Sequence, residues 1–410
     1  MVQKSGATDC PAGYIFDKQN VLHRTVNDSR SHMKKIGILG GGQLGRMLLQ
    51  AAANYPVETH VLENDSECPA AHLCHKFTRG DIRNFDDVYA FGKQVDVLTI
   101  EVEQVNTDAL VKLEQEGVEV IPSPTAISTL NNKIRQKEFY RTHQIPSPDF
   151  IITQNREALG QHLSFLPAVH KLGTGGYDGR GVQVLRGTGD LSQGFDQPSV
   201  LEKKVDIARE IAILVAAGRD GNPTLYPPVD MVFDKTLNQL DYQLCPAELD
   251  QKTGWTIEAL ALAVVKALKS PGIFAVELFI DRAGTVWVNE TAPRVHNSGH
   301  HTIEASYCSQ FDMLWRILLG YPLGNTESIM PSATINIIGA PDETGAARYE
   351  GLEELLKVGN AFFHLYGKKE TRPGRKMGHA TVLSNEKQEL LHQINKIRHG
   401  LRVTGSTSED

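Results

Sequence analysis

Residues 35–53, KIGILGGGQLGRMLLQAAA, determine how the organised part of the chain begins. The apolar run 35–39 is typical of a buried strand, residues 40–45 form a glycine-rich turn, and residues 46–53 place apolar side chains at helical spacing. Strands that alternate with helices predict a parallel, doubly wound α/β sheet. Further apolar runs that alternate with helical segments lie at 57–62, 95–100 and 118–121.

The GxGxxG turn at 40–45 matches the template of a dinucleotide fingerprint, and acidic Glu63 follows about 20 residues on. Alone, this pattern predicts a nicotinamide-dependent oxidoreductase. Its physics implies less, because backbone N–H groups at a helix N-terminus attract any phosphate or other anion. NAD and a phosphorylated substrate therefore remain alternatives, with Gln43 and Arg46 facing either one. A turn that only packs the helix on the strand is a third reading.

The composition is that of an ordinary soluble globular protein, with 40% hydrophobic and 22% charged residues among 410. At about 100–200 residues per domain, this length allows roughly two to four domains. Lys and Arg number 42 against 49 Asp and Glu, which gives a net charge of −7. Such a mildly acidic chain argues against a general nucleic-acid surface, so anion binding must come from local clusters of cations.

The cysteines and the apolar segments predict a cytoplasmic protein without membrane attachment. The five cysteines lack the spacing of a disulfide framework or the paired CxxC of a zinc site, which favours a reducing compartment. No apolar run reaches the ~20 residues that span a bilayer, and no signal-peptide core precedes the first strand. Residues 1–32 end in Ser31-His32, which with Met33 resembles an expression-vector scar before a natural start; a native surface arm is the alternative.

Beyond residue 146 the pattern changes to short strands separated by glycine-rich turns, which predicts antiparallel pairing. A long amphipathic helix is expected at 255–268 and another helix at 386–398. The expected strands lie at 167–171, 182–185, 199–203, 210–215, 274–280, 286–289, 333–338, 361–365 and 379–383. These elements predict three domains between an arm and a polar tail, with the bounds 1–32, 33–130, 131–330, 331–400 and 401–410.

A glycine-rich hairpin follows Lys171, which closes a strand. Residues 174–181, TGGYDGRG, carry four glycines between two strands, so this loop could fold as a flap whose backbone donors close over a polyphosphate. No GK[ST] opens a helix here, which excludes a Walker loop. Lys171 could place its ammonium on the phosphates. A plain turn is the alternative, but Tyr177, Asp178 and Arg180 are unusual residues for one.

Two acidic residues further on could contact a nucleoside. Glu202 ends a strand and precedes residues 203–205, whose backbone could pair with an adenine edge. Glu210 could accept hydrogen bonds from ribose hydroxyls. Taken singly, either residue would be interpreted as a solvated surface acid.

Glu277 and Glu290 are the candidates for metal ligands. Each lies in or at the end of an apolar strand, where an unpaired carboxylate is costly to bury. A hairpin with its turn at 282–284 would bring them together. Adjacent carboxylates repel unless a cation lies between them, and hard oxygen ligands at a phosphate site favour Mg²⁺. A buried salt bridge is the rival, which the neutral oxygens of Asn289 and Asn297 disfavour.

Two loops after these strands could hold the substrate. Residues 291–300, TAPRVHNSGH, could bind a small anion and hydroxyl groups, although His296 alone would more often be structural. Residues 368–379 place five cations in a Pro/Gly loop, where a solvated charge run is the usual alternative. In an acidic chain, a pocket for a substrate monophosphate is favoured. A nucleic-acid site would need a broader positive face with aromatic residues.

Four motifs together resemble the ATP-grasp superfamily and, within it, the N5-carboxyaminoimidazole ribonucleotide synthetase family. They lie at 42–47 (GQLGRM), 174–181 (TGGYDGRG), 289–300 (NETAPRVHNSGH) and 372–379 (RPGRKMGH). The resemblance implies an ATP-grasp fold of α/β and α+β type, with an N-terminal Rossmann-like pre-ATP-grasp domain, a central lid domain and a C-terminal domain. Nucleotide would bind between the second and third domains.

The resemblance implies a ligase reaction of purine biosynthesis. ATP and bicarbonate would form carboxyphosphate, and the amine of 5-aminoimidazole ribonucleotide would take the carboxyl group, with release of ADP and phosphate. One or two Mg²⁺ ions would be the cofactor. A homodimer is implied, and the mutase that follows would be a separate chain. The alternatives are a formate-dependent glycinamide ribonucleotide transformylase, the nicotinamide oxidoreductase and a non-catalytic nucleotide sensor.

The resemblance also assigns roles by position. Lys133 and Phe233 depart from the family, where an arginine and a histidine are expected, and this puts only nucleotide affinity in doubt. The metal ligands would be Glu277 and Glu290. The catalytic residues would be Asp178, which orients the amine, Arg180 and Arg294, which hold the carboxylate, His296 and Asn297. ATP would contact Lys133, Lys171, Gly176, Tyr177, Asp178, Gly179, Arg180, Gly181, Val182, Glu202, Lys203, Lys204, Val205, Glu210, Phe233, Asn289 and Glu290. The ribonucleotide and bicarbonate would contact Gln43, Leu44, Glu103, Tyr177, Asp178, Arg180, His296, Asn297, Ser298, Lys369, Arg372, Arg375 and Lys376.

Overall fold

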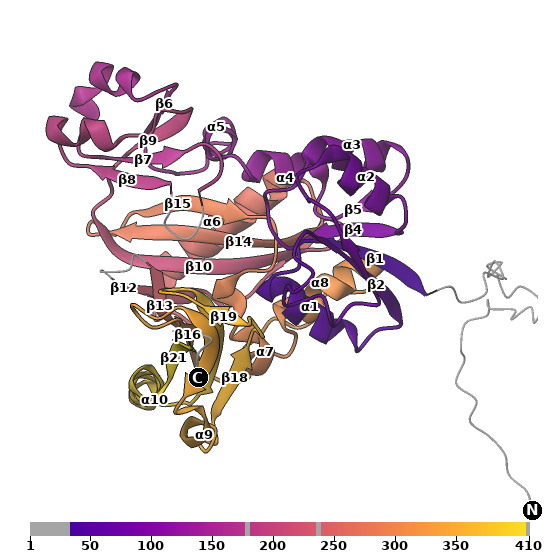
Figure 1. Cartoon of the computed structure of the whole chain (residues 1–410). Coiled ribbons are helices and arrows are strands. Elements are labelled where there is room, and N and C mark those ends of the chain that lie inside the picture. Colours follow the sequence, from indigo (N-terminus) through magenta and orange to yellow (C-terminus); the bar gives the residue numbers. More distant parts are fainter. Residues whose placement is uncertain (1–32, 177–180, 235–238, 407–410) are drawn as a thin grey trace, which may run out of the picture. The chain divides into compact units, whose positions relative to one another are not determined.

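The computed structural model describes residues 33–176, 181–234 and 239–406, and its compact unit begins at Lys34 (Figure 1). Four residues of the expected flap therefore lie outside the described residues, together with the roles assigned to them above: Tyr177, Asp178, Gly179 and Arg180.

A five-stranded sheet opens the compact unit, and all of its strands run parallel. The strand order is β3-β2-β1-β4-β5, so the direction of winding reverses beside β1. This confirms the expected doubly wound sheet and adds one strand, β3, to it. The elements are β1 (Lys34–Leu39), α1 (Gln43–Ala52), β2 (Val57–Glu63), β3 (Lys76–Arg79), α2 (Phe85–Gly92), β4 (Val97–Ile100), α3 (Thr107–Gln115), β5 (Glu119–Val120) and α4 (Pro124–Leu130).

A smaller antiparallel sheet follows, in the order β6-β9-β7-β8. Strands β7 and β8 form the hairpin whose loop carries the glycine-rich segment, as expected from the sequence. Helix α5 (Lys133–Thr142) precedes this sheet along the chain, and the Lys133 N–H donates to the Gly173 carbonyl at the base of the loop. The strands are β6 (Phe150–Thr153), β7 (Ala168–Leu172), β8 (Val182–Leu185) and β9 (Ser199–Lys203).

A long antiparallel sheet forms the centre of the compact unit, with β11 paired to β10 and the main order β15-β14-β10-β12-β13-β16-β20-β18 (Figure 1). Strands of the expected last domain, β16, β18 and β20, continue this sheet, so residue 331 is no boundary between sheets. The strands are β10 (Ile207–Ala217), β11 (Pro223–Leu225), β12 (Val229–Asp234), β13 (Gln239–Cys245), β14 (Gly272–Asp281), β15 (Val286–Ala292), β16 (Ser332–Ile338), β18 (Ala361–Leu365) and β20 (Lys376–Leu383).

Helix α6 (Gln251–Leu268) covers part of the long sheet. It begins four residues before the expected start because Asp250 accepts a hydrogen bond from the Thr253 N–H and caps the helix. Its buried Ile257, Ala261 and Val264 share one apolar core with strands β10 and β14. The remaining α-helices and strands are α7 (Thr302–Ala305), α8 (Gln310–Leu319), β17 (Gly345–Glu350), α9 (Leu352–Leu355), β19 (Glu370–Thr371), α10 (Lys387–Gly400) and β21 (Arg402–Ser406).

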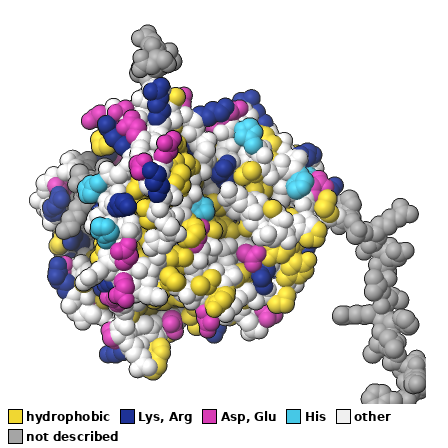
Figure 2. All heavy atoms as spheres, turned by 90° about the horizontal axis from the view of Figure 1, so that it is seen from below, with side chains coloured by type: hydrophobic (Ala, Val, Ile, Leu, Met, Phe, Trp, Pro, Cys, Tyr) yellow, Lys and Arg dark blue, Asp and Glu magenta, His cyan; other side chains and the backbone are white. Residues whose placement is uncertain are grey.

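The surface shows no segregation of charge on the face drawn in Figure 2, where basic and acidic side chains are interspersed. Within the described ranges, helices that combine enough length with enough apolar character to cross a bilayer are absent.

Two buried histidines give the fold a pH-dependent stability. Burial lowers the pKa of both His300 and His379 well below the ordinary value of about 6.5. Below that pH the unfolded chain binds more protons than the folded chain, so the free energy of unfolding falls on acidification from pH 7 to 5, by about 2 kcal/mol per histidine. Urea unfolding at both pH values should show a smaller loss for His379→Gln than for wild type. An equal loss would contradict this assignment.

Candidate active site

A cavity of about 600 Å³ lies where the turn after β1, helix α5, the glycine-rich loop and the long sheet converge. This volume suits a small organic ligand. The sequence-predicted residues in its lining are Gln43, Leu44, Glu103, Lys133, Gly176, Phe233, Glu277, Glu290, Arg294, His296, Asn297 and Lys376. The other described candidates lie outside the lining, namely Lys171, Gly181, Val182, Glu202, Lys203, Lys204, Val205, Glu210, Asn289, Ser298, Lys369, Arg372 and Arg375.

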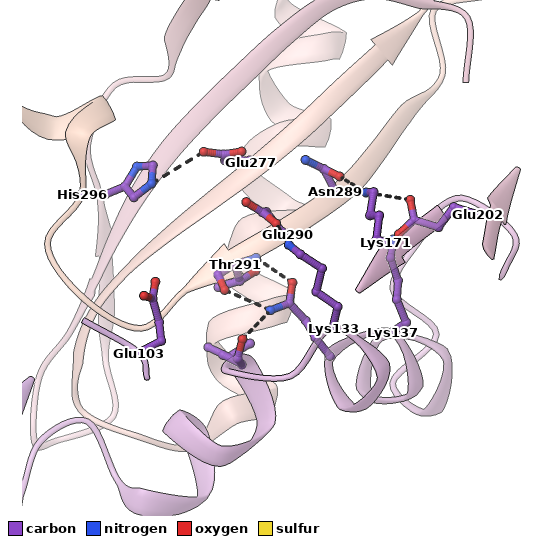
Figure 3. Close-up of polar contacts among 12 residues, drawn as sticks. Glu103, Lys133, Lys137, Lys171, Glu202, Glu277, Asn289, Glu290, Thr291 and His296 are labelled. Atoms are coloured by element: carbon purple, nitrogen blue, oxygen red, sulfur yellow. Dashed lines mark hydrogen bonds and ion pairs between the residues drawn. The ribbon is translucent and has the colours of Figure 1, made fainter. Parts of the chain in front are cut away.

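Three carboxylates lie on one face of the long sheet. Glu277 on β14 and Glu290 on β15 are partners in the antiparallel ladder, so their side chains project to the same side. Ala212 of β10 is the partner of Glu277 on the other side, and Glu210 shares the face of Ala212. Figure 3 shows the carboxylates of Glu277 and Glu290 near each other in the cavity. The hairpin expected to bring this pair together is confirmed.

The electrostatic surroundings of the acids are unequal. Lys133 Nζ contacts Glu290 Oε2 and holds the pKa of Glu290 below its usual range. Burial, followed by repulsion from Glu290 and Glu210, raises the pKa of Glu277. Burial also raises the pKa of Glu210 to about 7. Glu277 and Glu210 thus carry an uncompensated cost of burial, to which repulsion from the neighbouring carboxylates adds at Glu277, and this favours an additional cation at this position.

The donor set fits a magnesium ion of the kind that accompanies nucleotide phosphates. Such an ion takes one or two protein carboxylates and completes its octahedron with water and phosphate oxygens. Glu277 and Glu290 supply two carboxylates. In the ranges that the structure describes, no group of three or more His, Cys, Asp or Glu side chains is arranged to hold a metal. The arrangement therefore suits an ion that shares its coordination with a ligand.

A buried charge cluster lies next to the acids. Lys171 Nζ is 2.9 Å from Glu202 Oε2 and 2.9 Å from Asn289 Oδ1. Lys137 Nζ is 3.1 Å from the other oxygen of Glu202. Burial acts against the ionised form, but the two lysines outweigh it and lower the pKa of Glu202. Glu202 is thus a buried counter-ion that fixes Lys171 beside Asn289 (Figure 3).

Sequence reasoning missed Lys137. Lys133 and Lys137 are four residues apart in α5 and therefore share one face of the helix, a signal that could have identified it. Only 3% of the Lys137 side chain is exposed, and burial lowers its pKa to about 8 against the attraction of Glu202.

Replacing Lys137 by Met should lower the free energy of unfolding by about 3 kcal/mol, because Glu202 would remain buried with one cation fewer. Urea unfolding measures this loss. The control is Lys112→Met, which removes an exposed lysine paired with Glu116 and should change stability by less than about 1 kcal/mol. Similar losses in the two variants would contradict the structural role of Lys137.

The loop after β15 is held by hydrogen bonds that keep its polar side chains at the cavity. The His296 N–H donates to Gln310 Oε1 at 2.8 Å, and His296 Nδ1 is 2.9 Å from Ser298 Oγ. His296 Nε2 lies 3.7 Å from Glu277 Oε1 (Figure 3). Asn297 Oδ1 is buried and has no hydrogen-bond partner among the described residues. A buried acceptor at the cavity wall without a partner is a candidate ligand-binding group.

Arg294 and Glu103 form an ion pair in the cavity lining, with 2.7 Å between Arg294 Nη2 and Glu103 Oε1. Both side chains are mostly buried. The pair joins the loop after β15 to the segment that follows β4, so two of the expected substrate-contacting segments are fixed relative to each other.

The glycine-rich turn after β1 binds a carboxylate of the chain itself. Glu101 Oε1 accepts hydrogen bonds from the N–H groups of Leu44 and Gly45, at 3.1 and 3.3 Å. Glu63 Oε2 accepts from the Gly41 N–H at 3.2 Å. The buried Glu101 carboxylate thus takes the position at the helix N-terminus where a dinucleotide phosphate would bind. The group bound by the N–H groups of this turn is therefore a carboxylate of the chain itself.

Only part of the basic cluster reaches the cavity. Lys376 lines it, while Lys369 contacts Glu67 at the surface. Lys368 Nζ donates to Gln43 Oε1 at 2.9 Å and to the Lys376 carbonyl at 2.6 Å. The assignment by position passed over Lys368, although its place in the same cluster was a signal.

Some hydrogen-bonding groups of residues 203–205, the stretch expected to contact adenine, already bind other parts of the chain. The N–H groups of Lys203 and Lys204 donate to the carbonyls of Asp149 and Pro167. The Lys203 ammonium donates to the Phe165 carbonyl at 3.1 Å. The N–H of Val205 is left as the candidate donor of this stretch, and the contact of residues 203–205 with ATP stays a prediction.

Three family models match consecutive parts of the chain. A ribonucleotide synthetase preATP-grasp domain matches residues 33–131, an ATP-grasp domain matches 138–311, and a phosphoribosylaminoimidazole carboxylase C-terminal domain matches 332–393.

Curated proteins and solved structures show the same similarity. The chain is 35% identical over 91% of its length to phosphoribosylaminoimidazole carboxylase of Vigna aconitifolia, and the match spans 68% of that protein. It is 33% identical to N5-carboxyaminoimidazole ribonucleotide synthase of Aquifex aeolicus, with 89% of this chain and 96% of that one covered. The crystal structure of N5-carboxyaminoimidazole synthase from Aspergillus clavatus, in complex with ADP and 5-aminoimidazole ribonucleotide, matches with 32% sequence identity and a TM-score of 0.81. The match covers 90% of this chain and 98% of that one.

Proposed function

Because the chain belongs to the N5-carboxyaminoimidazole ribonucleotide synthase family of ATP-grasp ligases, we propose that its cavity carboxylates 5-aminoimidazole ribonucleotide. The chain is an ATP-dependent ligase of purine biosynthesis. The observation that carries the placement of the reaction is the pairing of Glu277 with Glu290 across β14 and β15, next to two lysines at the base of the glycine-rich loop.

The first half of the reaction transfers a phosphoryl group. A bicarbonate oxygen attacks the γ-phosphorus of ATP, the bond to the bridging oxygen breaks, and ADP leaves while carboxyphosphate forms. Lys133 and Lys171 would hold the phosphate oxygens and stabilise the charge that develops in transfer. Mg²⁺, held by Glu277 and Glu290, would neutralise triphosphate charge.

The second half transfers the carboxyl group. The exocyclic amine attacks the carboxyl carbon of carboxyphosphate, the bond from carbon to the phosphate oxygen breaks, and the amine proton passes to the leaving phosphate. His296 and Asn297 would orient bicarbonate and the amine, because they lie at the cavity wall beside Glu277. Arg294 would hold the developing carboxylate. Asp178 and Arg180, in the loop outside the described residues, complete the proposed catalytic set.

The ribonucleotide would lie between the loop after β15 and the basic loop. Lys376, Lys368 and Gln43 form one polar group at the cavity and would bind its phosphate. Arg372 and Arg375 belong to the same proposed phosphate pocket. In this proposal the ribonucleotide phosphate would lie away from the triphosphate, with the amine near His296.

The proposed reaction is tested by phosphate release from ATP with 5-aminoimidazole ribonucleotide, in the presence and absence of bicarbonate. Phosphate release that requires both co-substrates supports the proposal. Formate with glycinamide ribonucleotide tests the transformylase alternative, and release with that pair alone would overturn the carboxylation.

The family resemblance also supports three proposals about the protein outside its reaction. They are a homodimer, transfer of the product to a separate mutase chain and a cytoplasmic location. Light scattering tests the first: a mass near twice the 45.2 kDa of the chain is expected.

A further inference from the structure

Three imidazoles, of which His300 and His379 are buried and His364 is partly exposed, are stacked where the substrate loop meets the C-terminal strands. The ring centroids of His300 and His379 are 4.3 Å apart with 12° between their planes, and those of His364 and His379 are 4.5 Å apart with 13°. His300 follows the loop that carries His296 and Asn297. His379 lies on β20, which begins at Lys376, and His364 is its partner on β18. The stack therefore joins two segments that are proposed to bind the substrate.

Tyr366 connects the members of this stack. Its hydroxyl lies 3.0 Å from His379 Nδ1 and 3.4 Å from His300 Nε2. A hydroxyl group has one proton, so one imidazole accepts from Tyr366 while the other donates to it. Because the contacting atoms are Nδ1 of His379 and Nε2 of His300, the two rings then hold the same tautomer, either both Nε2–H or both Nδ1–H. The Tyr366 side chain is 1% exposed, which excludes water as an easy substitute.

The other side of Tyr366 contacts the basic loop. Lys368 Nζ lies 5.4 Å from the centroid of the Tyr366 ring, and the same ammonium donates to Gln43 Oε1 and to the Lys376 carbonyl. Tyr366 thus contacts His300 after the loop that follows β15 and Lys368 of the basic loop, and Lys368 in turn contacts the turn after β1. Each of these segments contributes residues to the cavity lining.

Burial, followed by repulsion from neighbouring groups, lowers the pKa of both His300 and His379 and keeps these two rings neutral. His300 faces His296, His301, His364 and Lys376, and His379 faces His300 and His364. At the outer end, His364 Nε2 is 2.6 Å from Glu304 Oε1. Neutral imidazoles can stack at the 4.3 Å that separates the His300 and His379 rings, and both can hydrogen-bond to the Tyr366 hydroxyl. The positions of the two rings therefore depend on that hydroxyl.

We propose that Tyr366 is a positioning residue for the ribonucleotide substrate. Through His300 and His379 on one side and Lys368 on the other, it sets the spacing between the phosphate-binding group and the loop of His296. This role rests on the proposed function. Tyr366 is not itself among the residues that line the cavity, so it acts on substrate through its neighbours.

The test is Tyr366→Phe, which removes the hydroxyl and retains the ring. A buried hydrogen bond of about 1.4 kcal/mol corresponds to about a tenfold effect. The KM for 5-aminoimidazole ribonucleotide should rise about tenfold, whereas the KM for ATP should stay within about twofold. The matched control is Tyr349→Phe, whose hydroxyl donates to the Met377 carbonyl and contacts no member of the stack. The control should leave both KM values unchanged.

Two results would overturn the positioning role. One is an unchanged KM for the ribonucleotide in Tyr366→Phe, and the other is a parallel rise in both KM values, which a merely structural role would produce. Should Tyr366→Phe fail to fold, ¹⁵N imidazole shifts of the wild-type protein provide the second measurement. Identical tautomers of His300 and His379, both Nε2–H or both Nδ1–H, are expected, and different tautomers would contradict the shared hydroxyl. Wild-type protein without ribonucleotide-dependent turnover would instead remove the proposed function, and the positioning role with it.

Discussion

Phosphate release from ATP falls about 10²–10³-fold when Glu290 is replaced by Gln, the range expected for loss of one charge-stabilising group at a transition state. Glu290 lies opposite Glu277 in the sheet and contacts Lys133. The amide keeps the shape of the side chain but removes the charge that would hold Mg²⁺ and orient Lys133. Release is measured with ATP, bicarbonate and 5-aminoimidazole ribonucleotide at saturating concentrations.

The control for this loss is Glu343→Gln, because Glu343 pairs with Arg402 and lies outside the cavity lining. Its rate should match wild type. A thermal melt of Glu290→Gln near that of wild type separates lost chemistry from lost folding. Wild-type phosphate release by a folded Glu290→Gln protein would show that the metal site lies elsewhere.

Replacing Lys376 by Met raises the KM for 5-aminoimidazole ribonucleotide about 10²-fold and changes the KM for ATP little. Lys376 lines the cavity beside Gln43, and its carbonyl accepts from Lys368. Removing one partner of a desolvated charge pair costs about 3 kcal/mol, which corresponds to about 10²-fold in affinity. Initial rates at varied ribonucleotide concentration measure this change.

Two lysines provide comparisons for Lys376. Lys357 is exposed and pairs with Glu354, so Lys357→Met should behave as wild type. Lys369 contacts Glu67 outside the lining, and Lys369→Met should raise the KM far less than Lys376→Met. If Lys376→Met raised the KM for ATP and not that for the ribonucleotide, the phosphate would have to bind in a different place.

Periodicity and turn residues predict most of the fold, because each strand and helix depends on neighbours in sequence. The parallel sheet, the hairpin of β14 and β15 and the start of the flap all follow from such local patterns. Helix α6 begins earlier than expected because Asp250 caps it from outside the apolar pattern. The continuation of the long sheet into β16, β18 and β20 depends on pairing between distant strands, which no local pattern specifies.

The same distinction separates the parts of the site that could and could not be predicted. Glu277 and Glu290 are visible from sequence because a carboxylate in an apolar strand needs an explanation. The role of Glu101 is not visible from sequence, because the residues whose N–H groups it accepts from, Leu44 and Gly45, lie more than 50 residues away along the chain. Its carboxylate occupies the anion-binding position of the turn. The role of Lys137 could not be predicted for a related reason. A lysine in a polar helix is expected to be exposed to solvent, and only the fold brings Glu202 into contact with it.

The central claim is that Glu277 and Glu290 bind one divalent ion together with the triphosphate. Anomalous diffraction from a crystal grown with Mn²⁺ and a non-hydrolysable ATP analogue tests it most directly. The account predicts an anomalous peak within coordination distance of both carboxylates and of the phosphates, at about 2.0–2.3 Å. A peak that touches neither carboxylate, with Lys133 still on Glu290, would contradict it.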